Sequence, residues 1–305
     1  MKKLIISALF TFLTAGSYAT NTNNDQINQA ANQGNKSHKT HAKKHTTKKN
    51  TSATKSTGVP KLHSYSAYSV DANTNQIIIN KNSDAVLPIA SITKIMTAMV
   101  LLDSKANLDD YVEITSDDVD TLRNTFSRLK VGMQLRRRDL LLLALMSSEN
   151  RAAHAIARTA YPGGLKEFIN RMNAKAKSLG MTNTKFFDPT GLTVENKSTA
   201  TDLAKMVKAA YQYDLIREDS TTKAADVMLS PRYTHRYVNS DALVRGDNLR
   251  IELSKTGFIN EAGHCLVLYT LVGQRPVIMV FLNSQGKSGR FVDALAVKRY
   301  VENQH

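Results

Sequence analysis

The chain has 305 residues, of which 42% are hydrophobic and 22% are charged, a composition typical of globular proteins. Its net charge of +15 is unevenly distributed, since residues 20–60 contain seven lysines and a single acidic residue. The lone cysteine, Cys265, excludes an internal disulfide, and its apolar neighbours predict a buried side chain.

The first 19 residues have the pattern of a secretory signal peptide. Lys2 and Lys3 precede an apolar run over residues 4–13, and small residues follow as far as Ala19. Ten apolar residues are too few for a membrane anchor, which needs about 20. We therefore expect export and cleavage near Ala19.

Residues 20–60 form a basic, polar tract with almost nothing to bury, so we expect a disordered linker. Lysine-rich tracts often bind nucleic acid, but an exported protein does not normally meet it. We therefore expect no nucleic-acid partner. At most, the tract makes loose electrostatic contact with anionic wall polymers or a membrane surface.

The folded body is expected to cover residues 61–305. Apolar spacing predicts, in chain order, strands at 64–70 and 76–80, helices at 91–104, 136–146, 151–160, 165–179 and 201–211, strands at 249–258, 265–272 and 276–282, and a helix at 289–301. Strands at both ends with helices between them predict an α/β fold. One antiparallel sheet is built from both chain ends and flanked by helices, with an inserted helical region.

A candidate nucleophile stands at the start of the first predicted helix. Ser91 and Lys94 are three positions apart and therefore share a helix face. The helix has little polar surface, so Lys94 should be buried, and burial lowers the pKa of a lysine. The alternative is a helix-capping serine beside a surface lysine. The same S-x-x-K spacing occurs where no helix is predicted to hold the pair, at Ser52, Ser127, Ser220 and Ser284.

Two further short motifs follow. Ser148-Glu149-Asn150 is the only S-x-N in the chain and lies between two predicted helices, where it could relay a proton or simply cap a helix. Lys255-Thr256-Gly257 lies in a predicted strand, where a cation and a hydroxyl could hold an anion and a glycine admits close backbone approach. The alternative is a solvated lysine on an edge strand.

The order S-x-x-K, S-x-N, K-T-G resembles the penicillin-recognising serine enzymes. Longer stretches are similar to the low-molecular-weight penicillin-binding proteins, namely residues 88–91, 143–153, 188–192, 255–258 and 262–265. The most similar subgroup is the D-alanyl-D-alanine endopeptidases, the penicillin-binding protein 7/8 type. The resemblance covers about residues 62–303 and implies the penicillin-binding/β-lactamase-like transpeptidase fold.

The resemblance also implies roles for individual residues. Ser91 would form an acyl ester, Lys94 would accept its proton, and Ser148 would pass a proton to the leaving amine. The residues expected to hold the substrate are Asn150, Lys255, Thr256, Gly257 and Phe258. The backbone N–H groups of Ser91 and Phe258 would form the oxyanion hole. Lys255 would also keep Lys94 neutral by charge repulsion, and no metal or cofactor is required.

The function implied is that of a periplasmic serine DD-peptidase acting on peptidoglycan peptides, with β-lactams as covalent inhibitors. We expect cleavage of D-alanyl-diaminopimelate cross-links, with D-Ala-D-Ala carboxypeptidase activity as the alternative. A β-lactamase is less favoured, because residues 153–255 lack the E-x-x-L-N stretch of class A enzymes. A non-catalytic envelope-binding protein is the third hypothesis. Since the sequence stops just after the last predicted helix, we expect no second β domain.

Overall fold

The computed structural model describes residues 58–304. The predicted signal peptide, most of the predicted linker and the Ser52 motif lie outside these described residues. Within them, no helix is both long and apolar enough to span a bilayer.

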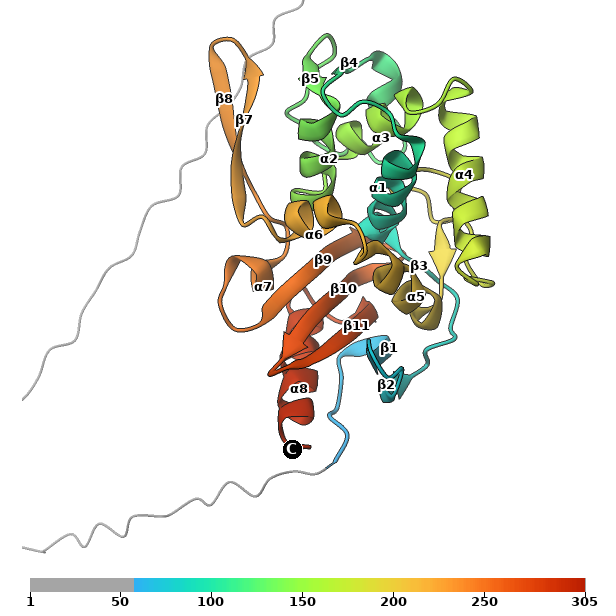
Figure 1. Ribbon diagram of the computed structural model, residues 1–305, viewed down its shortest axis with the longest axis vertical. Coiled ribbons are helices and arrows are strands. Elements are labelled where there is room, and N and C mark those ends of the chain that lie inside the picture. Colours follow the sequence, from blue (N-terminus) through green and yellow to red (C-terminus); the bar gives the residue numbers. More distant parts are fainter. Residues whose placement is uncertain (1–57, 305) are drawn as a thin grey trace, which may run out of the picture. The chain divides into compact units, whose positions relative to one another are not determined.

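A five-stranded antiparallel sheet combines both ends of the described chain, as predicted (Figure 1). The strand order is β2-β1-β11-β10-β9. The bounds are β1 Ser64–Asp71, β2 Ile77–Lys81, β9 Arg250–Ile259, β10 Gly263–Val272 and β11 Arg275–Ser284. β10 and β11 read as nearly continuous apolar runs because both faces of the sheet are covered. Cys265 is fully buried in β10, which confirms the prediction.

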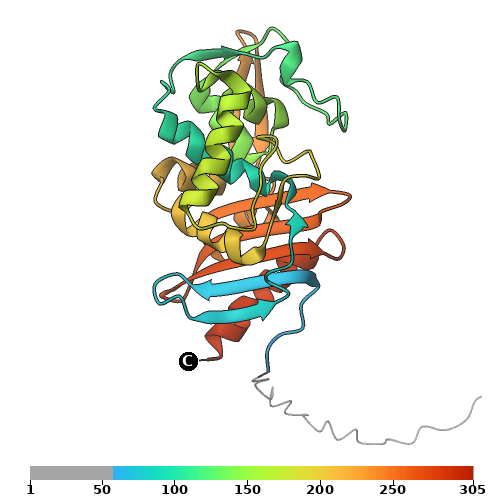
Figure 2. The ribbon, with the colours of Figure 1, turned by 90° about the vertical axis from the view of Figure 1, so that its right-hand side faces the viewer.

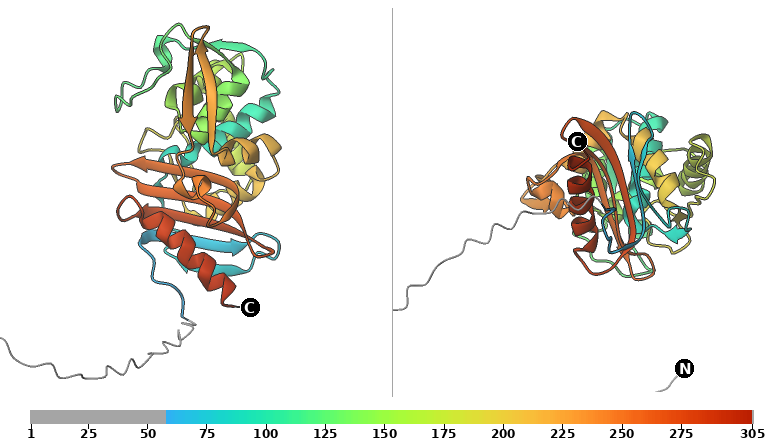
Figure 3. Two further views of the ribbon diagram at one scale, coloured as in Figure 1. Left: turned by 90° about the vertical axis from the view of Figure 1, so that its left-hand side faces the viewer. Right: turned by 90° about the horizontal axis from the view of Figure 1, so that it is seen from below.

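The two faces of the sheet carry separate apolar cores. Helix α8 (Gly289–Glu302) packs on one face and buries Ala294, Val297 and Val301 (Figure 3). Helix α5 (Ala200–Ala210) packs on the other. Alternation along β10 serves both cores: Leu266 faces the α8 side, and Val267 belongs to the larger core.

The middle of the chain is helical, and every helix predicted there is confirmed to within a few residues (Figure 2). The bounds are α1 Thr93–Ser104, α2 Arg137–Met146, α3 Asn150–Thr159, α4 Gly164–Ser178 and α6 Asp214–Thr221, besides α5. Residues 93–101 of α1 are all buried, so this helix is the centre of the helical region. Short strand pairs complete it, β3 Leu87–Pro88 with β6 Lys197–Ser198, and β4 Tyr111–Glu113 with β5 Gln134–Arg136.

The prediction omitted several elements between α5 and β9. They are α6, the short helix α7 (Ala242–Arg245), and a hairpin of β7 (Ala224–Ser230) and β8 (Tyr233–Val238) that stands apart from the main sheet (Figure 1). Val227 and Leu229 of β7 and Tyr237 of β8 are buried, but the apolar Met228 between the first two is exposed. The sequence therefore shows no apolar–polar alternation that would mark these strands.

Ser220 requires a correction, because it does lie on a helix. It is buried near the end of α6, where its hydroxyl accepts a hydrogen bond from the Ser254 N–H at 3.3 Å. Lys223 lies beyond the helix and pairs with Asp247 at the surface. Ser220 therefore joins α6 to β9 and has no lysine base.

Candidate active site

Ser91 lies in a 3₁₀ turn, η1 (Ala90–Ile92), which leads directly into α1. Ala90 has a left-handed φ of +48°, which is costly for a residue with a Cβ and which turns the chain sharply just before Ser91. The helix predicted from residue 91 thus begins with this tighter turn. Ser91 remains partly exposed, and Lys94 lies in the first turn of α1, buried.

Two glycines allow other segments to close on the nucleophile. A Cβ on Gly191 (φ +84°) would lie 1.9 Å from the Ala90 carbonyl oxygen, so only glycine fits. A Cβ on Gly257 in β9 would lie 3.0 Å from the Ile89 carbonyl oxygen. The close approach that Gly257 permits is therefore to the backbone that carries Ser91.

The Lys94 amine has three hydrogen-bond partners. Its Nζ lies 2.8 Å from Ser91 Oγ, 2.7 Å from Asn150 Oδ1 and 2.7 Å from the Thr190 carbonyl oxygen. Burial lowers the pKa of Lys94 to about 7, against the opposing charges of Asp188 and Glu149.

A neutral Lys94 can serve only two of these partners as a donor. An uncharged amine has two N–H bonds and one lone pair, whereas an amide oxygen and a carbonyl oxygen can only accept. Its two protons therefore go to Asn150 and Thr190, and its lone pair faces the Ser91 hydroxyl. The arrangement is that of a base poised to take the Ser91 proton. Thr190 lies in one of the stretches that carried the resemblance, but no role was predicted for its carbonyl.

The S-x-N and K-T-G motifs meet at Ser148. This residue has a left-handed φ of +64°, and its hydroxyl accepts a hydrogen bond from Lys255 Nζ at 3.0 Å. Lys255 also donates to the Thr256 carbonyl at 2.9 Å and is only 1% exposed. Its amine therefore reaches the surroundings of Ser91 through Ser148, and the alternative of a solvated lysine on an edge strand is wrong.

Burial is the main cause of the lowered pKa of Lys94, as predicted. The pKa of Lys255 is held well below its usual value, first by burial and then by the charge of Lys94. Repulsion between like charges is mutual, so two ammonium groups in this buried site are unfavourable. The expected help of Lys255 in keeping Lys94 neutral stays a prediction.

A cavity of about 650 Å³ opens beside Ser91. The predicted residues that line it are Ser91, Ser148, Asn150, Thr256, Gly257 and Phe258. Lys94 and Lys255 are buried and do not line it. The structure therefore brings all eight predicted residues together, six around the cavity and two beneath its surface.

Other lining residues were missed by the sequence analysis. They include Leu122, Arg123, Thr125, Leu192, Ser240 and Arg290. Ser240 lies 2.8 Å from Thr256, hydroxyl to hydroxyl. Arg290 carries a positive charge in the first turn of α8, where the helix dipole disfavours a cation. That unfavourable placement could have marked Arg290 as a functional residue in the sequence. Nothing in the sequence marks Ser240.

The rim of the cavity includes large apolar side chains. Phe258 is 54% exposed and stacks on His264 with ring centroids 4.4 Å apart, and Leu122 is 64% exposed. The stacking gives His264 a supporting place at the rim. Exposed apolar side chains beside a cavity are typical of sites that bind a ligand or partner.

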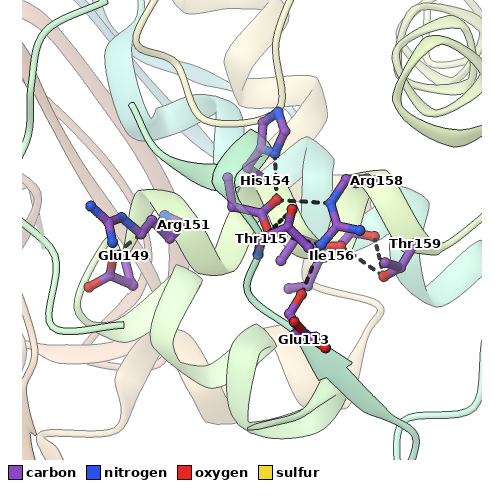
Figure 4. A network of polar contacts seen from close by, with 10 residues as sticks. Glu113, Thr115, Glu149, Arg151, His154, Ile156, Arg158 and Thr159 are labelled. Atoms are coloured by element: carbon purple, nitrogen blue, oxygen red, sulfur yellow. Dashed lines mark hydrogen bonds and ion pairs between the residues drawn. The ribbon is translucent and has the colours of Figure 1, made fainter. Parts of the chain in front are cut away.

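A polar network joins α3 to the preceding turn η2 (Ser116–Asp118), as Figure 4 shows. The buried carboxylate of Asp118 accepts hydrogen bonds from Arg158 at 2.8 Å and from the Thr115 N–H at 2.8 Å, and it lies 2.7 Å from His154 Nδ1. Burial alone would raise the pKa of Asp118, but these contacts lower it to about 2. His154 is thus part of a structural network one turn beyond Asn150, which joins α3 to η2.

Comparisons with known proteins point in one direction. A family model described as D-alanyl-D-alanine carboxypeptidase, Peptidase_S11, matches residues 50–286. The chain is 47% identical over 253 residues to a D-alanyl-D-alanine endopeptidase of Escherichia coli, covering 83% of this chain and 81% of the relative. It is 48% identical over 242 residues to one of Pseudomonas aeruginosa, covering 79% and 78%. The solved Streptomyces K15 DD-transpeptidase is similar with a TM-score of 0.74 and 30% identity, covering 79% of this chain and 97% of that one.

Proposed function

The chain belongs to the Peptidase_S11 family of D-alanyl-D-alanine carboxypeptidases, and we propose that it is a serine DD-peptidase that cleaves D-alanyl cross-links in peptidoglycan. The observation that carries the mechanism is the geometry of Lys94. Its two acceptor partners leave the lone pair of the neutral amine facing Ser91.

In the proposed reaction, Ser91 Oγ attacks the D-alanyl carbonyl carbon while Lys94 takes the hydroxyl proton. The Ser91 and Phe258 N–H groups stabilise the oxyanion. Ser148 passes a proton to the leaving nitrogen and is reprotonated with the proton that Lys94 took, the C–N bond breaks, and an acyl ester remains on Ser91. Water then attacks the ester carbonyl and loses a proton to the neutral Lys94. The bond between the carbonyl carbon and Ser91 Oγ breaks, Lys94 returns the proton to Ser91 Oγ, and the acid is released.

The carboxylate next to the scissile amide needs a cationic, hydrogen-bonding surface. Thr256 and Arg290 line the cavity, and the buried Lys255 donates a hydrogen bond to Ser148, which also lines it. We assign the carboxylate to this group and the substrate amide to Asn150. A penicillin, which carries a carboxylate and a strained amide, would acylate Ser91 by the same route.

Endopeptidase activity is favoured by the two relatives that carry this name. The rim gives independent support, because the exposed Leu122 and Phe258 can contact the larger leaving peptide of a cross-link. Carboxypeptidase activity is the second candidate, favoured by the family description, and it uses the same residues.

We place the enzyme in the periplasm. The proposal includes removal of residues 1–19 as a signal peptide and a tethering or wall-binding role for residues 20–60, with the catalytic body from residue 61 onward. Two bacterial cell-wall enzymes as relatives support this location.

The deciding experiment compares two substrates. Purified enzyme is incubated with cross-linked dimeric muropeptides and with a monomeric pentapeptide, and product masses are followed over time. We expect dimers to yield monomers faster than the pentapeptide loses D-alanine. If trimming of the pentapeptide dominates while dimers persist, the enzyme is a carboxypeptidase. With Ser91→Ala neither reaction should occur.

A further inference from the structure

The loop between η2 (Ser116–Asp118) and β5 folds around one carboxylate. Asp120 accepts hydrogen bonds from the backbone N–H groups of Leu122, Arg123 and Thr125 at 2.9, 3.0 and 2.9 Å. Burial alone would raise the pKa of Asp120, but the Thr125 and Arg123 N–H groups lower it. The carboxylate is therefore ionised at neutral pH and can only accept hydrogen bonds.

Because the Asp120 carboxylate can only accept, the direction of its hydrogen bond with the Thr125 hydroxyl is determined. Thr125 Oγ1 lies 2.7 Å from Asp120 Oδ2, so its single proton is donated there. Towards Asn150 Nδ2, 3.0 Å away, the same oxygen can only accept. The Asn150 amide must then present its NH₂ group to Thr125 and its oxygen to Lys94, at 2.7 Å.

The opposite orientation of the amide would disable the base. With the NH₂ group facing Lys94, an N–H of Asn150 would compete with the Ser91 hydroxyl for the Lys94 lone pair. The ammonium form of Lys94 would also lose an acceptor, which lowers its pKa. Nothing in the Lys94–Asn150 contact alone selects the productive orientation, since each amide face can form a hydrogen bond.

We propose that Asp120 and Thr125 are positioning residues that hold the Asn150 amide with its oxygen on Lys94. The lone pair of neutral Lys94 is thereby kept on Ser91. This inference rests on the proposed function, because it assigns a purpose to two residues outside the three motifs. Neither residue needs to touch the reacting atoms.

The other charges around Lys94 are independent of this relay. Asp188 and Glu149 act on Lys94 by their charge, and Lys255 approaches through Ser148. A change at Thr125 leaves all three side chains in place, so a shift in the titration of Lys94 would report the amide orientation.

The test measures the rate of acylation by a fluorescent penicillin from pH 5 to 9. The variants are Thr125→Val, which keeps the shape but removes the hydroxyl, and Thr125→Ser, which restores it. Asp120→Asn frees the Thr125 proton for Asn150. Thr121→Val makes the same chemical change at an exposed position on the same loop and serves as the matched control.

We expect Thr125→Val to lower the acylation rate about 10- to 100-fold, a part of the 10²–10⁴-fold that general-base catalysis contributes. The acidic limb of its pH–rate profile should move to lower pH, because the ammonium form of Lys94 has lost an acceptor and the pKa of Lys94 falls. Asp120→Asn should move the limb in the same direction. Thr125→Ser and Thr121→Val should match the wild type.

An unchanged acidic limb in Thr125→Val would overturn the inference, as would a Thr125→Ser variant that is equally impaired. A limb that also moves in Thr121→Val would assign the effect to the loop in general and overturn it too. Failure of the wild type to be acylated would instead overturn the proposed function, and this inference with it.

Discussion

Lys94 would be an ammonium ion at neutral pH if it were exposed, since a free lysine has a pKa near 10.4. In this protein, burial in the first turn of α1 lowers its pKa to about 7. A substantial fraction of the enzyme therefore carries a neutral amine beside Ser91 at physiological pH. The role depends on desolvation and cannot be transferred to an exposed lysine.

The first prediction concerns the pH dependence of acylation. Protonation removes the Lys94 lone pair, so the second-order rate of acylation should fall about tenfold per pH unit below about 7 and level off above it. Stopped-flow measurement with a fluorescent penicillin tests this. Lys94→Arg, which stays charged throughout, should remain inactive across the range. A rate independent of pH between 5 and 8 would show that Lys94 is not the base.

The eight predicted site residues were found because short motifs and a family resemblance mark them in the sequence. Arg290 and Ser240 were missed, since they come from elements that fold onto the site without a motif. Lys94 is buried as predicted, whereas the alternative of a solvated Lys255 on an edge strand is wrong, because Lys255 is only 1% exposed. Depth of burial depends on tertiary packing, which spacing along the chain does not report.

At the scale of elements, the site depends on how closely the segment around Gly191 can approach η1. This contact places the Thr190 carbonyl on Lys94 and shapes the backbone before Ser91. It requires a residue that has no Cβ and tolerates a positive φ.

The second prediction separates these two requirements. Gly191→Ala and Gly132→Ala both place alanine at a positive φ, +84° and +87°, which costs roughly 1–2 kcal/mol. Only at Gly191 does the new Cβ collide with backbone, whereas at Gly132 nothing lies within 4 Å. We expect both variants to lose some thermal stability, and only Gly191→Ala to lose penicillin labelling. Equal labelling of the two folded variants would contradict the close approach.

Prediction of the elements succeeded where apolar periodicity was strong. α1 and β10 bury most of their residues, and both were predicted within a few residues of their observed ends. The β7–β8 hairpin was missed because its strands pair with each other and bury only a few side chains, such as Val227 and Leu229. Apolar periodicity appears in a sequence where many side chains of an element pack into a core, and the hairpin strands bury too few to show it.

On the scale of the whole molecule, chain ends far apart in sequence form one sheet, in which β1 pairs with β11. The helical region then packs against one face of this sheet, with the motif residues gathered beside β9. The sequence predicted this arrangement because strands at both ends must share a partner. It predicted the helix that contains Arg290, but not that this helix would bring Arg290 to the cavity.

The third prediction concerns residues 20–60, whose charge is strongly positive. If they serve only as a tether or as a contact with anionic polymer, a chain without them should be acylated at the wild-type rate. Its binding to isolated cell-wall sacculi should weaken, and the difference should shrink as salt reduces the Debye length below about 8 Å. Pull-down at several salt concentrations measures this. A slower acylation of the shortened chain would place part of the tract in the catalytic body.

The most direct measurement of the proposed chemistry is the intact mass of the protein after exposure to a penicillin. The wild type should gain one penicilloyl group, located by peptide mapping on the peptide that contains Ser91. Ser127→Ala, which removes a serine with the same spacing to a lysine, should gain it too. Ser91→Ala should gain nothing, since loss of a serine nucleophile typically costs on the order of a million-fold in rate. A penicilloyl group on Ser91→Ala, or on any other residue of the wild type, would contradict the mechanism.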